Sequence, residues 1–239
     1  MTLKPDTYSL YARTLPALIS ATPLFVLWYF VRRDAEWRGL LTFVFSLRFL
    51  GAISLSAVFL YFYSHFLRYT SKWFERRYFT SRRGFPTTYF MLFHDTTYSK
   101  DYKAKFRARV KAICKLDLLD EADEHSQPLE AKNRLNECIN HIRLKVGPGK
   151  LVLKHNIWYG FTRNLLGGAI YSSLFCCVNI LLGLMVLKSD PLVIASAILL
   201  VIYSTLLMFH RALLFQNAEA YARQLISEFM AVGNVRSPK

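Results

Sequence analysis

The sequence predicts an α-helical integral membrane protein: four transmembrane helices, a small cytoplasmic α+β insert between helices 2 and 3, and a C-terminal amphipathic helix. Hydrophobic residues make up 53% of the 239 residues, and the mean hydropathy is +0.21. Lys and Arg number 31 against 16 Asp and Glu, and most of these bases lie in the middle of the chain. A soluble domain of this length rarely combines these features.

Four apolar segments occupy residues 15–31, part of 40–67, 165–187 and 191–209. Each supplies about 20 residues, enough to cross a hydrocarbon core of about 30 Å. They are continuously apolar rather than alternating, which favours helices because a helix satisfies its own backbone groups in lipid. The division that follows is a helix pair in 1–67, a basic insert in 68–163, a second pair in 164–209 and a C-terminal helix and tail in 210–239.

The first segment is expected to be a membrane helix rather than a cleaved signal peptide, because Asp6 stands in its leader and no small-residue cleavage site follows it. Basic residues follow the second segment at once: Arg68, Lys72, Arg76, Arg77, Arg82 and Arg83. The positive-inside rule therefore places the insert and both termini in the cytoplasm, although three arginines in 32–38 weaken the bias.

Arg48 lies inside the second apolar stretch. A central intramembrane arginine costs at least ~2.5 kcal/mol and needs a partner. Alternatively the span begins near Phe49, with Arg48 at the outer interface and residues 40–47 along the membrane surface.

Two helices are predicted in the insert. The first, 99–115, is capped by Ser99 and places Tyr102, Phe106, Val110 and Ile113 on one face. The second, 128–146, buries a face of Leu135, Cys138, Ile139, Ile142 and Val146 before the Gly-Pro-Gly turn at 147–149. The acidic run 117–124 is interpreted as a solvated linker, and 87–93 and 150–161, rich in β-forming residues, as two paired strands.

The basic residues of the insert have two interpretations. With Tyr69, Trp73 and Tyr78 they form a membrane-interface anchor on anionic lipid headgroups. Alternatively they bind an anionic ligand or an acidic partner, since bases also flank the helix at 99–115. The candidate anion-binding residues are Arg76, Arg77, Arg82, Arg83, Lys103, Arg107 and Lys111.

The third apolar segment carries a stripe of small and polar residues: Gly168, Ser172, Cys176, Asn179 and Gly183. Small residues allow close helix packing, which is one interpretation. The other makes Ser172, Cys176 and Asn179 pore-lining in an oligomer. The C-terminal helix, 210–230, has an apolar face that needs a partner, either the insert or another subunit.

Enzyme chemistry is not predicted, because the histidines are scattered and no P-loop, nucleophile elbow or metal-binding spacing occurs. The four cysteines are expected to be reduced thiols, and no cofactor or metal is predicted. A weaker interpretation is a lipid-handling enzyme that uses His94 and Asp95 at the membrane interface.

The segments GFPTTYFMLF (84–93) and KVGPGKLVLKHNIWYGFTRNLLGG (145–168), around an insert flanked by membrane helices, resemble bacterial multi-pass membrane effectors of anti-phage defence of the Hailong type. The membrane subunit of Kiwa-type systems is the competing resemblance. The Hailong resemblance implies a homo-oligomeric ion channel of the bacterial inner membrane, controlled by an oligonucleotide that a partner nucleotidyltransferase makes. It transfers no ligand-binding residue to this chain.

The sequence thus supports two functions of different classes. One is an ion channel gated by a nucleotide or oligonucleotide bound to the insert. The other is a non-conducting membrane scaffold that recruits a soluble partner protein through the insert and the C-terminal helix.

Overall fold

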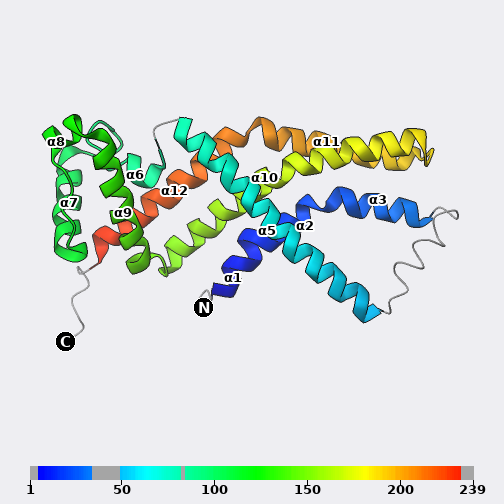
Figure 1. Cartoon of the computed structure of the whole chain (residues 1–239), viewed down its shortest axis with the longest axis horizontal. Coiled ribbons are helices and arrows are strands. Elements are labelled where there is room, and N and C mark those ends of the chain that lie inside the picture. The colour runs from blue at the N-terminus through cyan, green and yellow to red at the C-terminus, as the bar shows by residue number, and fades with distance from the viewer. Residues whose placement is uncertain (1–4, 34–48, 82–83, 233–239) are drawn as a thin grey trace. The chain divides into compact units, whose positions relative to one another are not determined.

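A computed structural model of the chain describes residues 5–33, 49–81 and 84–232. Arg48, Arg82 and Arg83 lie outside these ranges. The described residues form helices joined by turns and contain no strand (Figure 1). The helical part of the predicted fold class is therefore confirmed.

Two helices are long and apolar enough to cross a membrane: α10 (Lys150–Met185) and α11 (Asp190–Met208). A third candidate is the pair Thr7–Ser20 and Thr22–Val31, which passes the same test if the two bent pieces form one span. These helices support a membrane protein, while four spans are not shown. The second predicted segment lies partly in α5 (Phe49–Ser81), a single helix that continues through the basic-aromatic run.

The N-terminal segment is broken into short pieces: α1 (Pro5–Ser9), the π-helix η1 (Leu10–Thr14), α2 (Leu15–Ser20) and α3 (Thr22–Arg33). Two prolines explain the breaks. Pro16 and Pro23 have no N–H to donate to the carbonyls four residues earlier, so regular α-helical bonding cannot continue there. The pieces on either side of Ala21 are bent by 41°.

The predicted strands are wrong. Residues 86–89 form the short helix α6 (Pro86–Tyr89), with Pro86 in its first turn and tight turns after it, and 150–161 form the start of α10. In 150–159 the side chains of Val152 and Tyr159 are buried, seven residues apart, while those of Leu151 and Trp158, one residue before each, are exposed. This spacing is that of a helix face, and packing outweighs the β propensity of the individual residues.

The two predicted helices of the insert are confirmed as α7 (Lys100–Cys114) and α9 (Pro128–Val146). Ser99 caps α7 by accepting a hydrogen bond from the Tyr102 N–H at 3.2 Å. All five residues predicted for the inner face of α9 are buried. The C-terminal helix is confirmed as α12 (His210–Ala231). The acidic run is not only a linker, since it contains the start of α8 (Glu121–Ser126).

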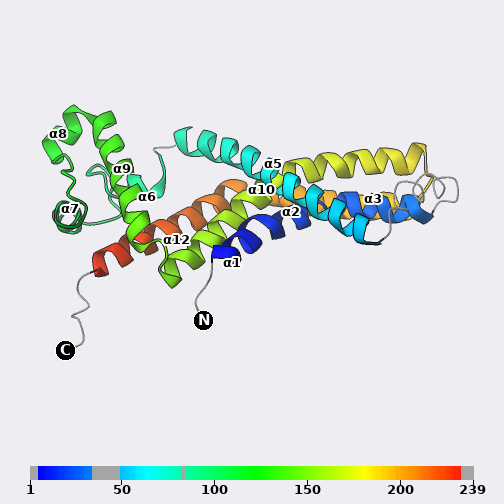
Figure 2. The ribbon, with the colours of Figure 1, turned by 60° about the horizontal axis from the view of Figure 1, so that its bottom comes forward.

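The chain divides into two compact units. The basic unit, as we call the first, comprises Arg76–Tyr159 and the chain from Phe215 onward; the membrane unit comprises Lys4–Glu75 and Gly160–Leu214. Helices α5, α10 and α12 each have residues in both units. Figures 1 and 2 show α6, α7, α8 and α9 grouped together within the basic unit.

Each unit has its own core. In the basic unit α12 buries Ala222, Leu225, Ile226 and Phe229, and the Phe229 ring meets the Phe106 ring of α7 edge to face at 5.7 Å. The apolar face of α12 is thus covered by the insert, as one of the two sequence alternatives required. In the membrane unit Ala17 and Ala21 pack with Tyr63 and Leu67 of α5.

Candidate functional site

The interior of the basic unit contains a buried lysine, Lys103, which is 1% exposed. Its position on α7 directs its ammonium group at the turns after α6, where it donates to the carbonyl oxygens of Leu92, at 2.6 Å, and of Asp95. Burial lowers the pKa of Lys103, and the Asp95 carboxylate acts in the opposite direction. The lysine therefore holds the 92–95 turn against α7.

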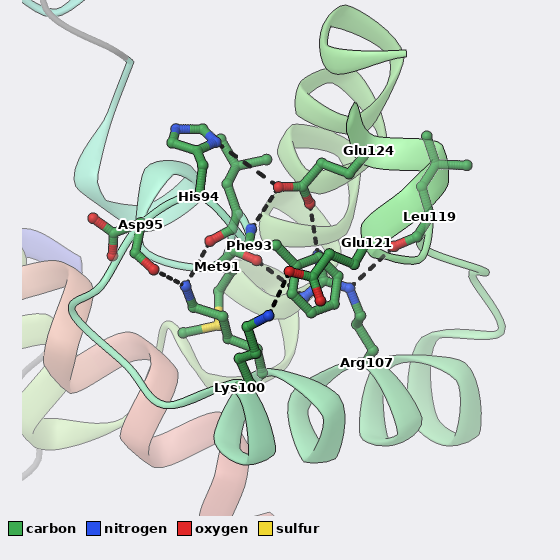
Figure 3. Close-up of polar contacts among 11 residues, drawn as sticks. Met91, Phe93, His94, Asp95, Lys100, Arg107, Leu119, Glu121 and Glu124 are labelled. Atoms are coloured by element: carbon green, nitrogen blue, oxygen red, sulfur yellow. Dashed lines mark hydrogen bonds and ion pairs between the residues drawn. The ribbon is translucent and has the colours of Figure 1, made fainter. Parts of the chain in front are cut away.

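Arg107, one turn further along α7, forms the second half of this network (Figure 3). It donates to Glu124 Oε2 at 2.9 Å, to Met91 O at 3.0 Å and to Leu119 O at 3.1 Å, and its guanidinium lies 3.8 Å from the centre of the Phe93 ring. Burial lowers the pKa of Arg107, while the Glu124 carboxylate opposes that shift. All three nitrogens of the guanidinium are thus used inside the protein.

Glu124 connects three segments of the chain. It accepts from the Phe93 N–H at 2.5 Å as well as from Arg107, and Figure 3 shows it between these two residues. Its side chain is only 7% exposed. The sequence analysis missed this carboxylate because it lies in an acidic run, and no local pattern distinguishes the buried acid from its exposed neighbours.

The predicted anion-binding residues fall into three groups. Lys103 and Arg107 make the contacts above, which gives them a structural role. Lys111 is exposed but lies 2.8 Å from the Asp117 carboxylate, and Arg76 and Arg77 are exposed at the end of α5. The described members of this set do not form a single cluster. Arg82 and Arg83 lie outside the residues that the structure describes.

The structure also shows the contacts of His94 and Asp95, the candidate residues of a lipid-handling enzyme. Asp95 Oδ1 accepts from the Thr97 N–H at 2.9 Å, which stabilises a turn. His94 Nδ1 lies 3.9 Å from Glu124 Oε1. Across the described part of the chain, no group of three or more His, Cys, Asp or Glu could hold a metal ion.

The polar stripe of α10 lies inside the membrane unit. Ser172 and Cys176 are fully buried and Asn179 is 1% exposed. Ser172 Oγ donates to Ser20 O at 2.8 Å, Asn179 Nδ2 donates to Pro23 O at 2.8 Å, and Cys176 packs against Tyr203. Within one chain these three side chains therefore join α10 to the broken N-terminal segment and to α11, as the packing interpretation requires; a pore-lining role stays a prediction.

The hydrogen bonds at the N-terminal breaks follow from the two prolines. Ala12 O lies four residues before Pro16 and accepts from Asn164 Nδ2 of α10 at 2.5 Å. Ile19 O lies four residues before Pro23 and accepts from Tyr203 OH of α11 at 2.5 Å and from Thr22 Oγ1 at 2.7 Å. Neighbouring helices thus supply the donors that the prolines lack, as membrane proteins require where a helix is interrupted.

The carbonyl oxygen of Ser20 also lacks its usual helical donor, because the helix is broken after this residue. The Leu24 N–H, which would bond it in a continuous helix, donates to Ala21 O at 2.9 Å instead. Ser20 O accepts from Ser172 Oγ and, at 3.4 Å, from Tyr63 OH. The polar stripe of α10 was predicted from the sequence, but the roles of Asn164 and Tyr203 were not. The prolines within the first apolar segment could have indicated them, because a proline in a helix leaves a carbonyl oxygen that needs another donor.

Two glycines allow the close approach of α10. A Cβ at Gly167 would lie 2.0 Å from Ser71 Oγ of α5, and one at Gly168 would lie 2.0 Å from Ser20 Oγ of α2. The α10 helix therefore contacts α5 and α2 at consecutive residues. Comparisons with protein-family models, curated proteins and solved structures found no match to this chain.

Proposed function

We propose that this chain is the subunit of a homo-oligomeric membrane effector, an ion channel gated by a nucleotide or oligonucleotide bound to the basic unit. The resemblance given above would place it in anti-phage defence at the bacterial inner membrane, with the basic unit and both termini cytoplasmic. What supports the proposal is that α10 is one helix with residues in both the basic unit and the unit that contains the interrupted N-terminal segment.

The observation that carries the proposal is the continuity of α10. Residues 150–159 belong to the basic unit, and the same uninterrupted helix supplies Asn164, Ser172 and Asn179 to the N-terminal breaks. A displacement of the first turns of α10 would therefore act on those hydrogen bonds. Glu228 of α12 fixes these turns, since its carboxylate accepts from the Val152 N–H at 3.3 Å.

Burial within the basic unit reduces the number of candidate ligand-binding residues. Lys103 and Arg107 are mostly buried, whereas Arg76 and Arg77 are exposed at the end of α5, where a ligand in solution can reach them. The proposal therefore assigns the ligand to Arg76 and Arg77. A ligand gates the channel only if it binds the open and closed states with different affinity. Bases at the end of α5 are suited to this, because α5 also packs on α10 through Ser71 and Gly167.

The test uses purified full-length chain in liposomes, with ion flux measured with and without short oligonucleotides. Arg76→Gln with Arg77→Gln should abolish the response to ligand. Lys105→Gln with Lys115→Gln removes the same charge from exposed lysines of the same unit and should preserve it. In a binding assay the first variant should reduce the log–log salt slope by about 1.4, as expected for two lost single-strand phosphate contacts.

Equal behaviour of the two double variants would contradict the assignment of the ligand to Arg76 and Arg77. Binding that does not depend on salt would contradict an electrostatic ligand site altogether. The absence of flux under every condition, from a folded oligomer, would favour the second candidate.

That second candidate is a non-conducting scaffold that recruits a soluble partner. One observation favours it: Ser172, Cys176 and Asn179 are buried within a single chain, where they serve packing. Asn179→Leu distinguishes the two, since it should alter flux through a channel and leave recruitment by a scaffold unchanged.

A further inference from the structure

Three arginines from three helices converge within the membrane unit. Arg13 lies in η1, Arg68 in α5 and Arg163 in α10. Each stands at the end of an apolar segment: Arg13 shortly before Leu15, Arg68 directly after Leu67 and Arg163 shortly before Leu165. If the predicted segments cross a membrane, such positions lie at the level where the membrane meets water.

Close helix packing brings together the three helix segments that carry these arginines. Asn164, next to Arg163, donates to the carbonyl of Ala12, next to Arg13. A Cβ at Gly160, one turn before Asn164, would lie 3.0 Å from Ala12 Cβ and 3.1 Å from Tyr8 OH. Gly167, one turn after Arg163, faces Ser71, which is three residues beyond Arg68 on α5. The same residues that hold the N-terminal break thus position the arginines.

The charges in this cluster do not balance. Arg163 Nη1 lies 3.4 Å from both oxygens of Glu75, and the two side chains are 11% and 8% exposed. Arg13 lies over the Tyr8 ring, 5.5 Å from its centre, and its Nε is buried with no hydrogen-bond partner. Arg13 and Arg163 both repel Arg68. Among the described side chains no carboxylate forms an ion pair with Arg13 or Arg68, so positive charge is in excess among the described residues of this cluster.

We propose that Arg13, Arg68 and Arg163 bind a phosphate group at the membrane surface. The guanidinium fork matches phosphate oxygens with paired charge-assisted hydrogen bonds, and a single phosphate would offset the excess charge. Basic pockets between membrane helices bind phospholipid headgroups in this way. A lipid headgroup and a free phosphate share this chemistry, and the experiment separates them.

This site is independent of the proposed function. It uses no residue of the basic unit, so loss of the oligonucleotide response in the Arg76 and Arg77 variant would leave it intact. Conversely, a chain that conducts no ions could still hold the phosphate group.

The experiment measures binding to the purified full chain with two probes. Phosphatidylglycerol is titrated in phosphatidylcholine nanodiscs and followed by native mass spectrometry, and inorganic phosphate is titrated by calorimetry. Arg13→Gln with Arg68→Gln should weaken binding by at least about tenfold, because two charged hydrogen-bond donors are lost. Lys188→Gln with Arg211→Gln, exposed residues of the same unit, removes equal charge and should bind like wild type.

Glu75→Gln provides the opposite change and keeps the test informative if the double arginine variant fails to fold. Removing the one carboxylate should tighten binding. Binding of phosphatidylglycerol alone identifies a lipid site, and binding of inorganic phosphate identifies a soluble ligand. If wild type binds neither probe, or if the arginine variant and the control bind equally well, the proposal is overturned.

Discussion

At the scale of single residues, the membrane unit is organised around carbonyl oxygens that lack their usual donors. Pro16 and Pro23 remove two backbone N–H groups, and the break after Ser20 redirects a third. Asn164, Tyr203 and Ser172 replace them from other helices. A buried carbonyl without a partner costs about 1–3 kcal/mol, so these side chains contribute to stability mainly by preventing that cost.

Ser20 O offers a test by double-mutant cycle, because two side chains share it. Ser172→Ala and Tyr63→Phe should each lower the free energy of unfolding by about 0.6 kcal/mol, the typical value for a hydrogen bond between membrane helices. Together they leave the oxygen without either side-chain donor, so the double variant should lose about 2 kcal/mol, more than the sum. Equilibrium denaturation in detergent measures the free energy of unfolding of the wild type, the two single variants and the double variant.

The control is Thr205→Ala, which removes an exposed hydroxyl that bonds only to Val201 O of its own helix. It should leave the free energy of unfolding unchanged. Strict additivity of Ser172→Ala and Tyr63→Phe would show that Ser20 O finds another donor and would refute this account of the break.

Residue roles were predictable from the sequence only where a local pattern determined them. The Ser99 cap and the buried face of α9 were predicted and are confirmed, because they depend on helical spacing and local chemistry. Whether a charge is buried depends on distant segments. Lys103 and Arg107 therefore looked like surface bases, and Glu124 looked like a linker residue, although they form one interior network.

At the scale of helices, α10 owes its position to small residues as much as to its hydrogen bonds. Its apolar residues alone would allow many orientations, since lipid provides no hydrophobic preference between them. Gly167 and Gly168 fix the orientation by admitting Ser71 and Ser20 at contact distance.

Gly167→Ala should destabilise the membrane unit by about 1–3 kcal/mol through overpacking, because its Cβ would meet Ser71 Oγ at 2.0 Å and the Ser71 Cα at 3.0 Å. In an exposed helix the same change is favourable by about 0.5–1 kcal/mol. Gly183→Ala is the matched control: its nearest contacts are side-chain atoms only, a Val193 methyl carbon at 2.8 Å and Leu192 at 3.5 Å, so no backbone atom has to move to admit the Cβ. In thermal unfolding, Gly167→Ala should have a clearly lower melting temperature than Gly183→Ala. The reverse order would contradict this packing.

Helix type was predictable where the apolar period was long, as in α7, α9, α11 and α12. The prediction failed at 150–161, where β-branched and aromatic residues suggested a strand. Burial of Val152 and Tyr159 on one helical face was decided by packing with other parts of the basic unit, which the local sequence does not contain. The continuity of α10 from that region to Met185 was missed for the same reason.

At the scale of the whole molecule, the proposed gating would require the hydrogen bonds between α10 and the N-terminal breaks to rearrange when a ligand binds. The structure supplies a direct way to prevent this. Ala12 and Gly160 face each other, with a Cβ at Gly160 only 3.0 Å from Ala12 Cβ. The Cβ atoms of a disulfide lie about 3.8 Å apart, so a bond here needs the two segments to separate only slightly. A bond there would lock η1 to α10.

The decisive measurement is therefore ion flux from liposomes containing Ala12→Cys with Gly160→Cys, in a background where Cys114, Cys138, Cys176 and Cys177 are replaced by serine or alanine. The account predicts ligand-dependent flux under reducing conditions, its loss on oxidation and its return with reductant. Each single-cysteine variant should be insensitive to oxidation. Ligand-dependent flux that persists with the disulfide formed would contradict the claim.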